Sequence, residues 1–114
     1  MAQDVFQRTI DRTLAELPEQ FHRHLENVEV LVQGSWDDDP DLYGLYDGVP
    51  LTERLVGATD MRGPDRVYVF RGPLVADFGH DPRLLEHEIR VTLLHELAHH
   101  FGIDDDRLAE LGWA

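Results

Sequence analysis

The apolar residues of the first 27 positions recur three or four residues apart along the chain. They are Phe6, Ile10, Leu14, Leu17, Phe21 and Leu25. This spacing predicts an amphipathic helix that packs on the core. Because proline removes a backbone donor within a helix, we expect the helix to stop near Leu17 and a second short turn to begin at Pro18. His22 and His24 lie near the end of this helical segment, so we expect them to be exposed helix-end residues and not metal ligands.

Two other segments alternate apolar and polar residues with the period of a half-buried β-strand. The first is Val28–Gln33, and residues 66–71 are the clearest example in the chain. Residues 42–47 predict a short strand or hairpin arm, which Asp47-Gly48 closes. We therefore expect a small mixed sheet of two to four strands.

The segments between these strands carry the residues typical of loops. Residues 36–41 contain four aspartates, but they lack the spacing and the glycine of a calcium-binding EF-hand loop. Residues 52–65 are expected to form a loop or a single helical turn, because glycine and proline punctuate them. A glycine-proline pair ends the last strand, and residues 72–81 are expected to form a loop that lines one rim of a cleft.

The longest apolar run, residues 84–101, lies between strong helix start and stop signals. Asp81 is placed to cap a helix, and Pro82 then occupies the first helical position, where no backbone donor is lost. Gly102 supplies the left-handed residue that ends a helix, and Ile103 is placed for the hydrophobic contact that follows it. The sequence therefore predicts a capped helix over residues 82–101.

Apolar residues make one stripe of this helix, and the histidines lie on the other side. The stripe is Ile89, Leu93 and Leu97, and roughly the opposite side carries Leu84, Glu88, Val91, Thr92, His95 and His99. We expect most of the surface of the helix to be buried, with the histidines facing a cleft. After it, residues 104–112 predict a last short helix with Leu108 and Leu111 pointing inward.

The side that bears the histidines contains the sequence His95-Glu96-Leu97-Ala98-His99. Residues four apart lie on one face of a helix, so the two imidazoles can bind a single ion. Glu96 lies about 100° round the helix from His95, where a general base takes a proton from metal-bound water. Ordinary helix residues could produce this pattern by chance. Two unpaired imidazoles among apolar neighbours would be costly to bury, however, and this favours a zinc site.

With Gly102 and Asp105 included, the motif reads HExxHxxGxxD and resembles the signature of the zincin metallopeptidases, in particular of the metzincins. The resemblance implies that His95, His99 and Asp105 bind zinc and that Glu96 is the catalytic general base. The chain is more similar still to a group of very small bacterial zincin-like metallopeptidases. That similarity extends beyond the motif to the Leu-Tyr-Gly-Leu-Tyr-Asp-Gly pattern before the helix and to the sequence after it.

The chain departs from the metzincin pattern in several ways. Asp105 stands where most members have a third histidine, so Asp104, Asp106 and Glu110 are rivals for the third ligand position, although a carboxylate is an acceptable zinc ligand. No methionine follows the motif, and only nine residues follow Asp105. We therefore expect half of the substrate cleft to be missing and cleavage to be weak or selective. A partner protein, a second subunit or a segment docked on the strand edge of residues 66–71 would complete the cleft.

Length and composition set limits on the fold and on partners. A chain of 114 residues predicts a single domain, residues 1–114, with a minimal zincin-like α+β fold: an N-terminal helix, a small sheet, the active-site helix and a short C-terminal helix. There is no cysteine, no signal-peptide pattern and no membrane-length apolar stretch, so we expect a cytoplasmic protein without a membrane partner. The net charge of −13, with arginine as the sole basic residue type, disfavours nucleic acid as a partner.

These features lead to one main hypothesis, a zinc metallopeptidase that binds one Zn²⁺ per chain and cleaves peptide or protein substrates. The main alternative is a zinc-binding regulatory or partner-binding module with little or no turnover. Metal-dependent RNA cleavage is a third class, but the acidic charge and Glu96 speak against it.

Overall fold

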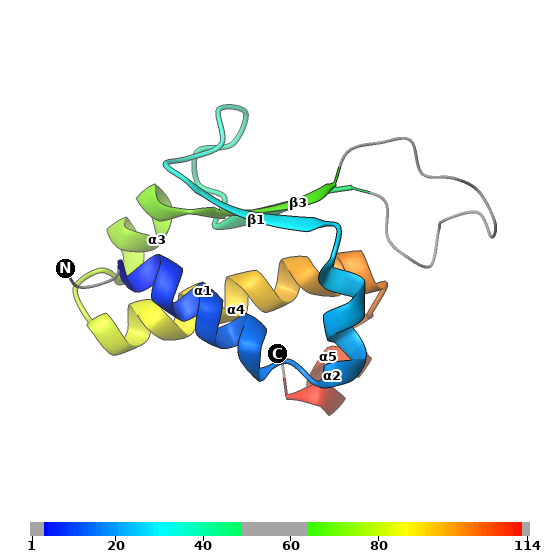
Figure 1. The fold of residues 1–114 in the computed structure, drawn as a ribbon. Helices are drawn as coiled ribbons and strands as arrows, with labels where there is room; N and C mark the ends of the chain where they lie inside the picture. The colour runs from blue at the N-terminus through cyan, green and yellow to red at the C-terminus, as the bar shows by residue number, and fades with distance from the viewer. Residues whose placement is uncertain (1–3, 49–63, 113–114) are drawn as a thin grey trace.

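Figure 1 shows one small mixed sheet with helices packed against one of its faces. The computed structural model describes residues 4–48 and 64–112, apart from the side chain of Asp105. The strands are β1 (Val28–Gln33), β2 (Gly44–Asp47) and β3 (Asp65–Phe70). The helices are α1 (Val5–Glu16), α2 (Glu19–His22), the 3₁₀ turn η1 (Arg23–Leu25), α3 (Arg71–Phe78), α4 (Pro82–Phe101) and α5 (Asp105–Leu111). The expected small α+β fold is confirmed.

The central strand of the sheet is β3. Strand β1 pairs with it in parallel, with Val30 opposite Val67, and β2 pairs antiparallel with its other side, with Tyr46 opposite the same Val67. The prediction that residues 66–71 offer a free strand edge is therefore wrong, because both edges of β3 are used in pairing. In the part of the chain that the structure describes, the outer strands are β1 and β2.

Both faces of β3 are buried, although a two-residue period predicts a half-buried strand. Val67 and Val69 belong to the core beneath the sheet. Tyr68 and Phe70 lie on the opposite face, where the Trp36 ring packs against them at centroid distances of 5.6 and 6.1 Å. Trp36 comes from the polar loop between β1 and β2, so this loop covers the second face.

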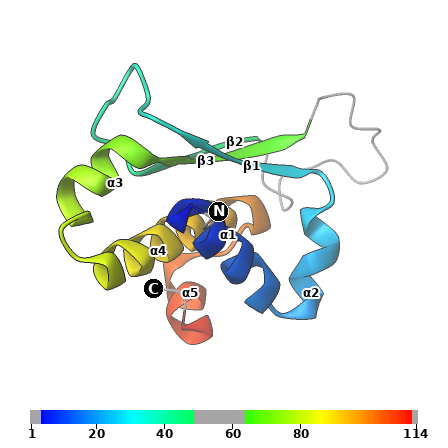
Figure 2. The ribbon, with the colours of Figure 1, turned by 60° about the vertical axis from the view of Figure 1, so that its left-hand side comes forward.

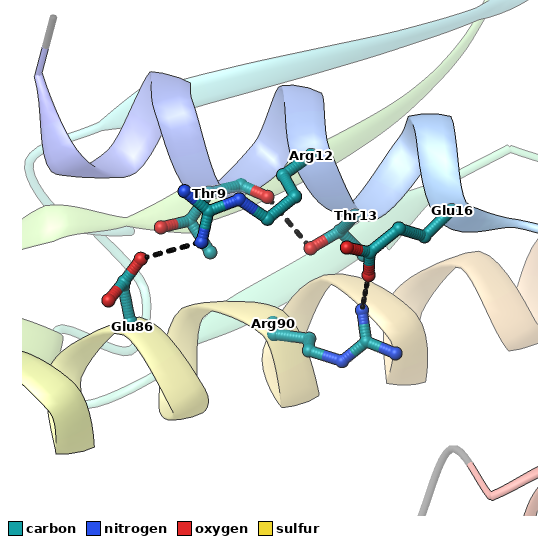
Figure 3. Close-up of polar contacts among 6 residues, drawn as sticks. All are labelled: Thr9, Arg12, Thr13, Glu16, Glu86 and Arg90. Atoms are coloured by element: carbon teal, nitrogen blue, oxygen red, sulfur yellow. Dashed lines mark hydrogen bonds and ion pairs between the residues drawn. The ribbon is translucent and has the colours of Figure 1, made fainter.

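Helices α1 and α4 run side by side beneath the sheet and in the same direction (Figures 1 and 2). Figure 3 shows two ion pairs between them: Arg12 Nη1 lies 3.1 Å from Glu86 Oε1, and Arg90 Nη1 lies 3.2 Å from Glu16 Oε2. Both pairs join residues 74 positions apart. A step of four residues along α1 therefore corresponds to a step of four residues along α4, as expected for parallel helices. Exposed ion pairs contribute about 0–1 kcal/mol each, so these pairs set the alignment of the helices more than their stability.

The core lies between the sheet and these helices. Its fully buried apolar side chains come from α1, β3, α3 and α4, and they include Phe6, Ile10, Val67, Val69, Leu74, Ile89, Leu93 and Leu97. Burying one such side chain stabilises a fold by about 1.5–3 kcal/mol. The N-terminal helix stops before Leu17, as predicted, and Pro18 precedes α2.

Helix α4 begins and ends at the residues that the sequence indicates. Asp81 Oδ1 accepts a hydrogen bond from the backbone N–H of Arg83 at 3.0 Å, so Asp81 is the N-cap. Gly102 ends the helix with a left-handed φ of 71°. The N–H of Ile103 then donates to the carbonyl oxygen of Ala98 at 2.9 Å, which completes a Schellman cap.

Residues 71–78 form helix α3, so the loop predicted for residues 72–81 is wrong over most of its length. Pro73 is the third residue of this helix, where a backbone N–H has no partner within the helix and its loss costs nothing. The N–H of Gly72 donates to the carbonyl oxygen of Gly34 at 2.8 Å, which ties the start of α3 to the end of β1. A glycine-proline pair therefore starts a helix here.

Most of the loop predicted for residues 52–65 lies outside the described residues. Its last residue, Asp65, is not in a loop but begins β3, where it pairs with Val28. None of the helices in the described ranges combines the length and the apolar character that a membrane span requires.

Candidate metal centre

His95 and His99 are exposed residues in an otherwise buried half of α4. The buried residues around them are Leu93, Leu94, Leu97, Ala98, His100 and Phe101. The side chain of His99 is 66% exposed. Because the two histidines are four residues apart, they lie on one face of the helix, and both are open to a ligand from solvent.

The side chain of Glu96 lies beneath strand β2 and is only 16% exposed. A Cβ atom placed on Gly44 would lie 3.1 Å from Glu96 Cγ and 2.6 Å from Thr92 Cγ2. A residue with a side chain would therefore collide with α4 at this position. Glycine lets the backbone of β2 approach α4 at the level of the predicted general base.

Burial raises the pKa of the Glu96 carboxyl, because the charged form loses contact with water. The imidazoles of His99 and His95 act in the opposite direction and lower this pKa when they are protonated. His99 Nε2 lies 4.0 Å from Glu96 Oε1. The carboxylate therefore stands beside the His99 imidazole, in surroundings that favour proton uptake.

A buried polar cluster lies next to the exposed histidines. His100, the residue after His99, is buried, and its Nδ1 lies 2.9 Å from Asp65 Oδ2. The Tyr46 hydroxyl donates a hydrogen bond to the same oxygen at 2.7 Å. His100 Nε2 lies 2.9 Å from the backbone carbonyl oxygen of His24. The cluster therefore ties the last turn of α4 to β3, β2 and η1.

These partners determine where the protons of His100 lie. A carbonyl oxygen only accepts hydrogen bonds, so Nε2 carries a proton and donates it to His24. Nδ1 lies within hydrogen-bonding distance of Asp65 Oδ2, so the second ring nitrogen also has a partner. Removing one member of a buried pair costs about 3–5 kcal/mol. The pair therefore strongly specifies the position of the last turn of α4.

Sequence reasoning missed both members of this pair, although a signal for each was present. Asp65 precedes Val67 by two residues, which places it on the same face of the strand. His100 follows Leu97 by three residues and continues the apolar stripe of α4. A polar residue at a position that the pattern assigns to the core indicates a partner, because buried polar groups are hydrogen-bonded.

The acids predicted as possible third ligands lie on or just before α5. Asp104 Oδ1 accepts from the N–H of Arg107 at 2.9 Å and caps the helix, and Glu110 Oε2 lies 2.9 Å from Arg107 Nη1. Asp106 is exposed. Asp105 is the first residue of α5, and its side chain lies outside the described residues. Among the side chains that are described, no three histidine or acidic residues form a group that could hold a metal ion.

The residues present agree with zinc in chemical type. Imidazole nitrogens are common zinc ligands, whereas calcium and magnesium prefer oxygen ligands. Catalytic zinc sites use three protein ligands and leave a position open for water or substrate. The exposed pair His95 and His99 would supply two of these ligands.

Comparison with known proteins agrees with this chemistry. Residues 19–113 match the family described as zincin-like metallopeptidases. The matched range contains the sheet, α4 and α5 and leaves out α1. No match was found among curated proteins. Because the family match covers most of the 114 residues, the chain belongs to the zincin-like metallopeptidase family.

Proposed function

We propose that this chain hydrolyses peptide bonds with a zinc ion held by His95, His99 and Asp105 and with Glu96 as the general base. The observation that carries the proposal is the arrangement on α4. Two exposed imidazoles lie on one face, and a carboxylate sheltered by β2 stands beside them. The family membership independently supports a zinc peptidase at this level.

When bound, zinc would supply Lewis acidity, which polarises a carbonyl oxygen and lowers the pKa of a bound water. Glu96 takes the proton of the attacking water at its carboxylate and passes it to the nitrogen of the leaving amine. Its low exposure keeps other water away from this proton. Asp104 and Glu110 already bond to Arg107, and of the two other acids, Asp105 and Asp106, the motif spacing favours Asp105 as the third ligand.

The outer edge of β2 is the best candidate for substrate binding. Within the described residues, no strand pairs with this edge, whereas both edges of β3 are occupied. An extended peptide that adds to an edge strand gains main-chain hydrogen bonds. Because Gly44 brings β2 close to Glu96, such a peptide would run past the general base. We therefore propose that unstructured protein segments are the substrates.

The metal is tested by elemental analysis of purified protein. We expect one zinc per chain in the parent, and little in His95→Ala or His99→Ala. His87→Ala is the matched control, because His87 is exposed on α4 eight residues before His95 and should not affect zinc. Asp105→Ala should weaken zinc binding, whereas Asp106→Ala should not. Full zinc content in a His95→Ala/His99→Ala double variant would refute the site.

The reaction is tested with Glu96→Gln on a library of unstructured peptides, with mass spectrometry of the products. We expect this variant to keep its zinc and to lose cleavage. Glu88→Gln is its control, since Glu88 lies eight residues earlier on the same helix and is partly buried too. If Glu96→Gln cleaves as fast as Glu88→Gln, the general-base assignment is wrong. If zinc binds but the parent cleaves nothing, the zinc-binding module is the better description.

A further inference from the structure

The ring of Tyr46 lies parallel to the ring of His99. The ring centroids are 6.4 Å apart and the ring planes differ by 8°. Offset parallel rings at such distances attract each other. Tyr46 belongs to β2, the same strand that covers Glu96. The sheet therefore places an aromatic ring beside a histidine that is otherwise mostly exposed.

The Tyr46 ring is itself held in place at its hydroxyl. This hydroxyl donates to Asp65 Oδ2 at 2.7 Å and lies 3.4 Å from His100 Nδ1. The side chains of Asp65 and His100 are 1% and 2% exposed, so the anchor is inside the protein. Fixing the hydroxyl sets χ1 and the long axis of the tyrosine ring, and the ring contacts with His99 and His100 limit rotation about that axis.

We propose that Tyr46 is a positioning residue for His99, and that the buried Asp65–His100 pair holds Tyr46 in place for this role. The ring limits the orientations of the His99 imidazole before any metal binds, so less conformational entropy is lost on binding. In the described part of the chain, His95 has no ring contact of this kind. The consequence for zinc depends on the proposed function, whereas the ring contact itself does not.

A role limited to fastening β2 onto α4 would have different consequences. It would change the free energy of unfolding but leave the His99 ring and its affinity for zinc unchanged. Tyr43 provides a matched control, because its hydroxyl also bonds to a carboxylate, that of Asp77, and its ring packs on Phe78 at a centroid distance of 5.5 Å. Variants of Tyr43 lose comparable contacts without touching His99.

The first test uses the metal-free protein and the NMR signals of the histidine ring C–H groups. In Tyr46→Leu we expect the His99 signals to move, because the ring current of Tyr46 is lost, while the His95 signals stay in place. Tyr43→Leu should move neither. Unchanged His99 signals in Tyr46→Leu would overturn the proposal. If Tyr46→Leu does not fold, Tyr46→Phe replaces it, and loss of the anchor should then broaden or shift the His99 signals while the His95 signals stay in place.

The second test measures zinc affinity by competition with a chelator, at a temperature where circular dichroism shows each variant folded. We expect Tyr46→Leu to bind zinc about tenfold and Tyr46→Phe about threefold more weakly than the parent. Tyr43→Leu and Tyr43→Phe should bind zinc as the parent does. If the parent binds zinc and Tyr46→Leu binds it equally well, the positioning role is wrong. If the parent binds none, the proposed function fails, and the NMR result alone decides the role of Tyr46.

Discussion

Gly44→Ala tests the contact between β2 and the general base most directly. The new Cβ would lie 2.6 Å from Thr92 Cγ2, 3.0 Å from the carbonyl oxygen of Tyr68 and 3.1 Å from Glu96 Cγ. Carbon atoms in good contact are about 3.5–4.0 Å apart. Thr92 is buried and cannot turn away without disturbing the core. The clash is therefore relieved by lifting β2 or by moving Glu96.

Forcing an extra methyl group into packed structure costs about 1–3 kcal/mol. For a domain of this size each kcal/mol lowers the melting temperature by about 3–6 °C, so we expect a drop of several degrees. Peptide cleavage should fall by more than tenfold, because the proton acceptor and the substrate edge move apart. Zinc per chain should fall far less than in His95→Ala or His99→Ala, since the atoms nearest to the new Cβ belong to Thr92, Tyr68 and Glu96. The assays are thermal unfolding, peptide cleavage and elemental analysis on the same preparation.

Gly34→Ala is the control, because a Cβ on Gly34 meets nothing within 4 Å and its φ is not positive. The double variant Gly44→Ala/Thr92→Ser removes the tightest contact, that with Thr92 Cγ2, but keeps the contact with Glu96. It should regain stability and regain less activity. The reasoning is refuted if Gly44→Ala melts and cleaves as Gly34→Ala does.

Three further predictions concern stability. The Thr9 hydroxyl is buried without a hydrogen-bond partner among the described residues, whereas the Thr13 hydroxyl donates to the Thr9 carbonyl oxygen at 2.7 Å (Figure 3). In urea unfolding, Thr9→Val should therefore be neutral or stabilising, and Thr13→Val should be destabilising by about 1 kcal/mol. The hydrogen bond from Arg71, followed by that from the Phe6 N–H, lowers the pKa of Asp4 from its usual 3.8. The charged Asp4 carboxylate therefore stabilises the fold at pH values above 3.8, and this stabilisation is lost as the pH falls through the lowered pKa. Asp4→Asn should lower the free energy of unfolding at neutral pH, and the difference from the parent should shrink in acid. A difference that grows in acid would contradict this prediction. Asp65→Ala should cost about 3–5 kcal/mol in urea unfolding, because it leaves the buried His100 imidazole without its partner. A loss below about 1 kcal/mol would show that the pair is not formed in solution.

The sequence predicts α4 well because the signals that define it are local. Asp81 and Gly102 act through hydrogen bonds within a few residues of themselves, and the apolar stripe between them needs one side to be buried, whatever covers it. The same signals place His95, Glu96 and His99 on the helix with their relative positions. The burial of Glu96 beneath β2 depends on a distant strand and does not follow from these signals, and the role of all three residues at a metal stays a prediction.

Features that depend on distant segments were not predictable in the same way. The strand order is such a feature, because the alternation of apolar and polar residues in β3 does not indicate which strands pair with its two edges. Helix α3 is another, since the anchor of Gly72 is a carbonyl group 38 residues earlier. The Asp65–His100 pair joins positions 35 residues apart, and only the fold brings them together.

The candidate ligands His95 and His99 lie on the same helix, α4, as buried residues at the centre of the core, so local unfolding of the segment that carries them also disrupts the core. Leu93 and Leu97 are fully buried on one side of α4, while His95 and His99 are exposed on the other. The backbone amides of this segment therefore exchange with solvent hydrogen only when the core itself comes apart, as is typical of the most protected segments of a domain. Release of a bound ion would then proceed through side-chain motion or displacement of α5, while the helix that carries the histidines stays intact.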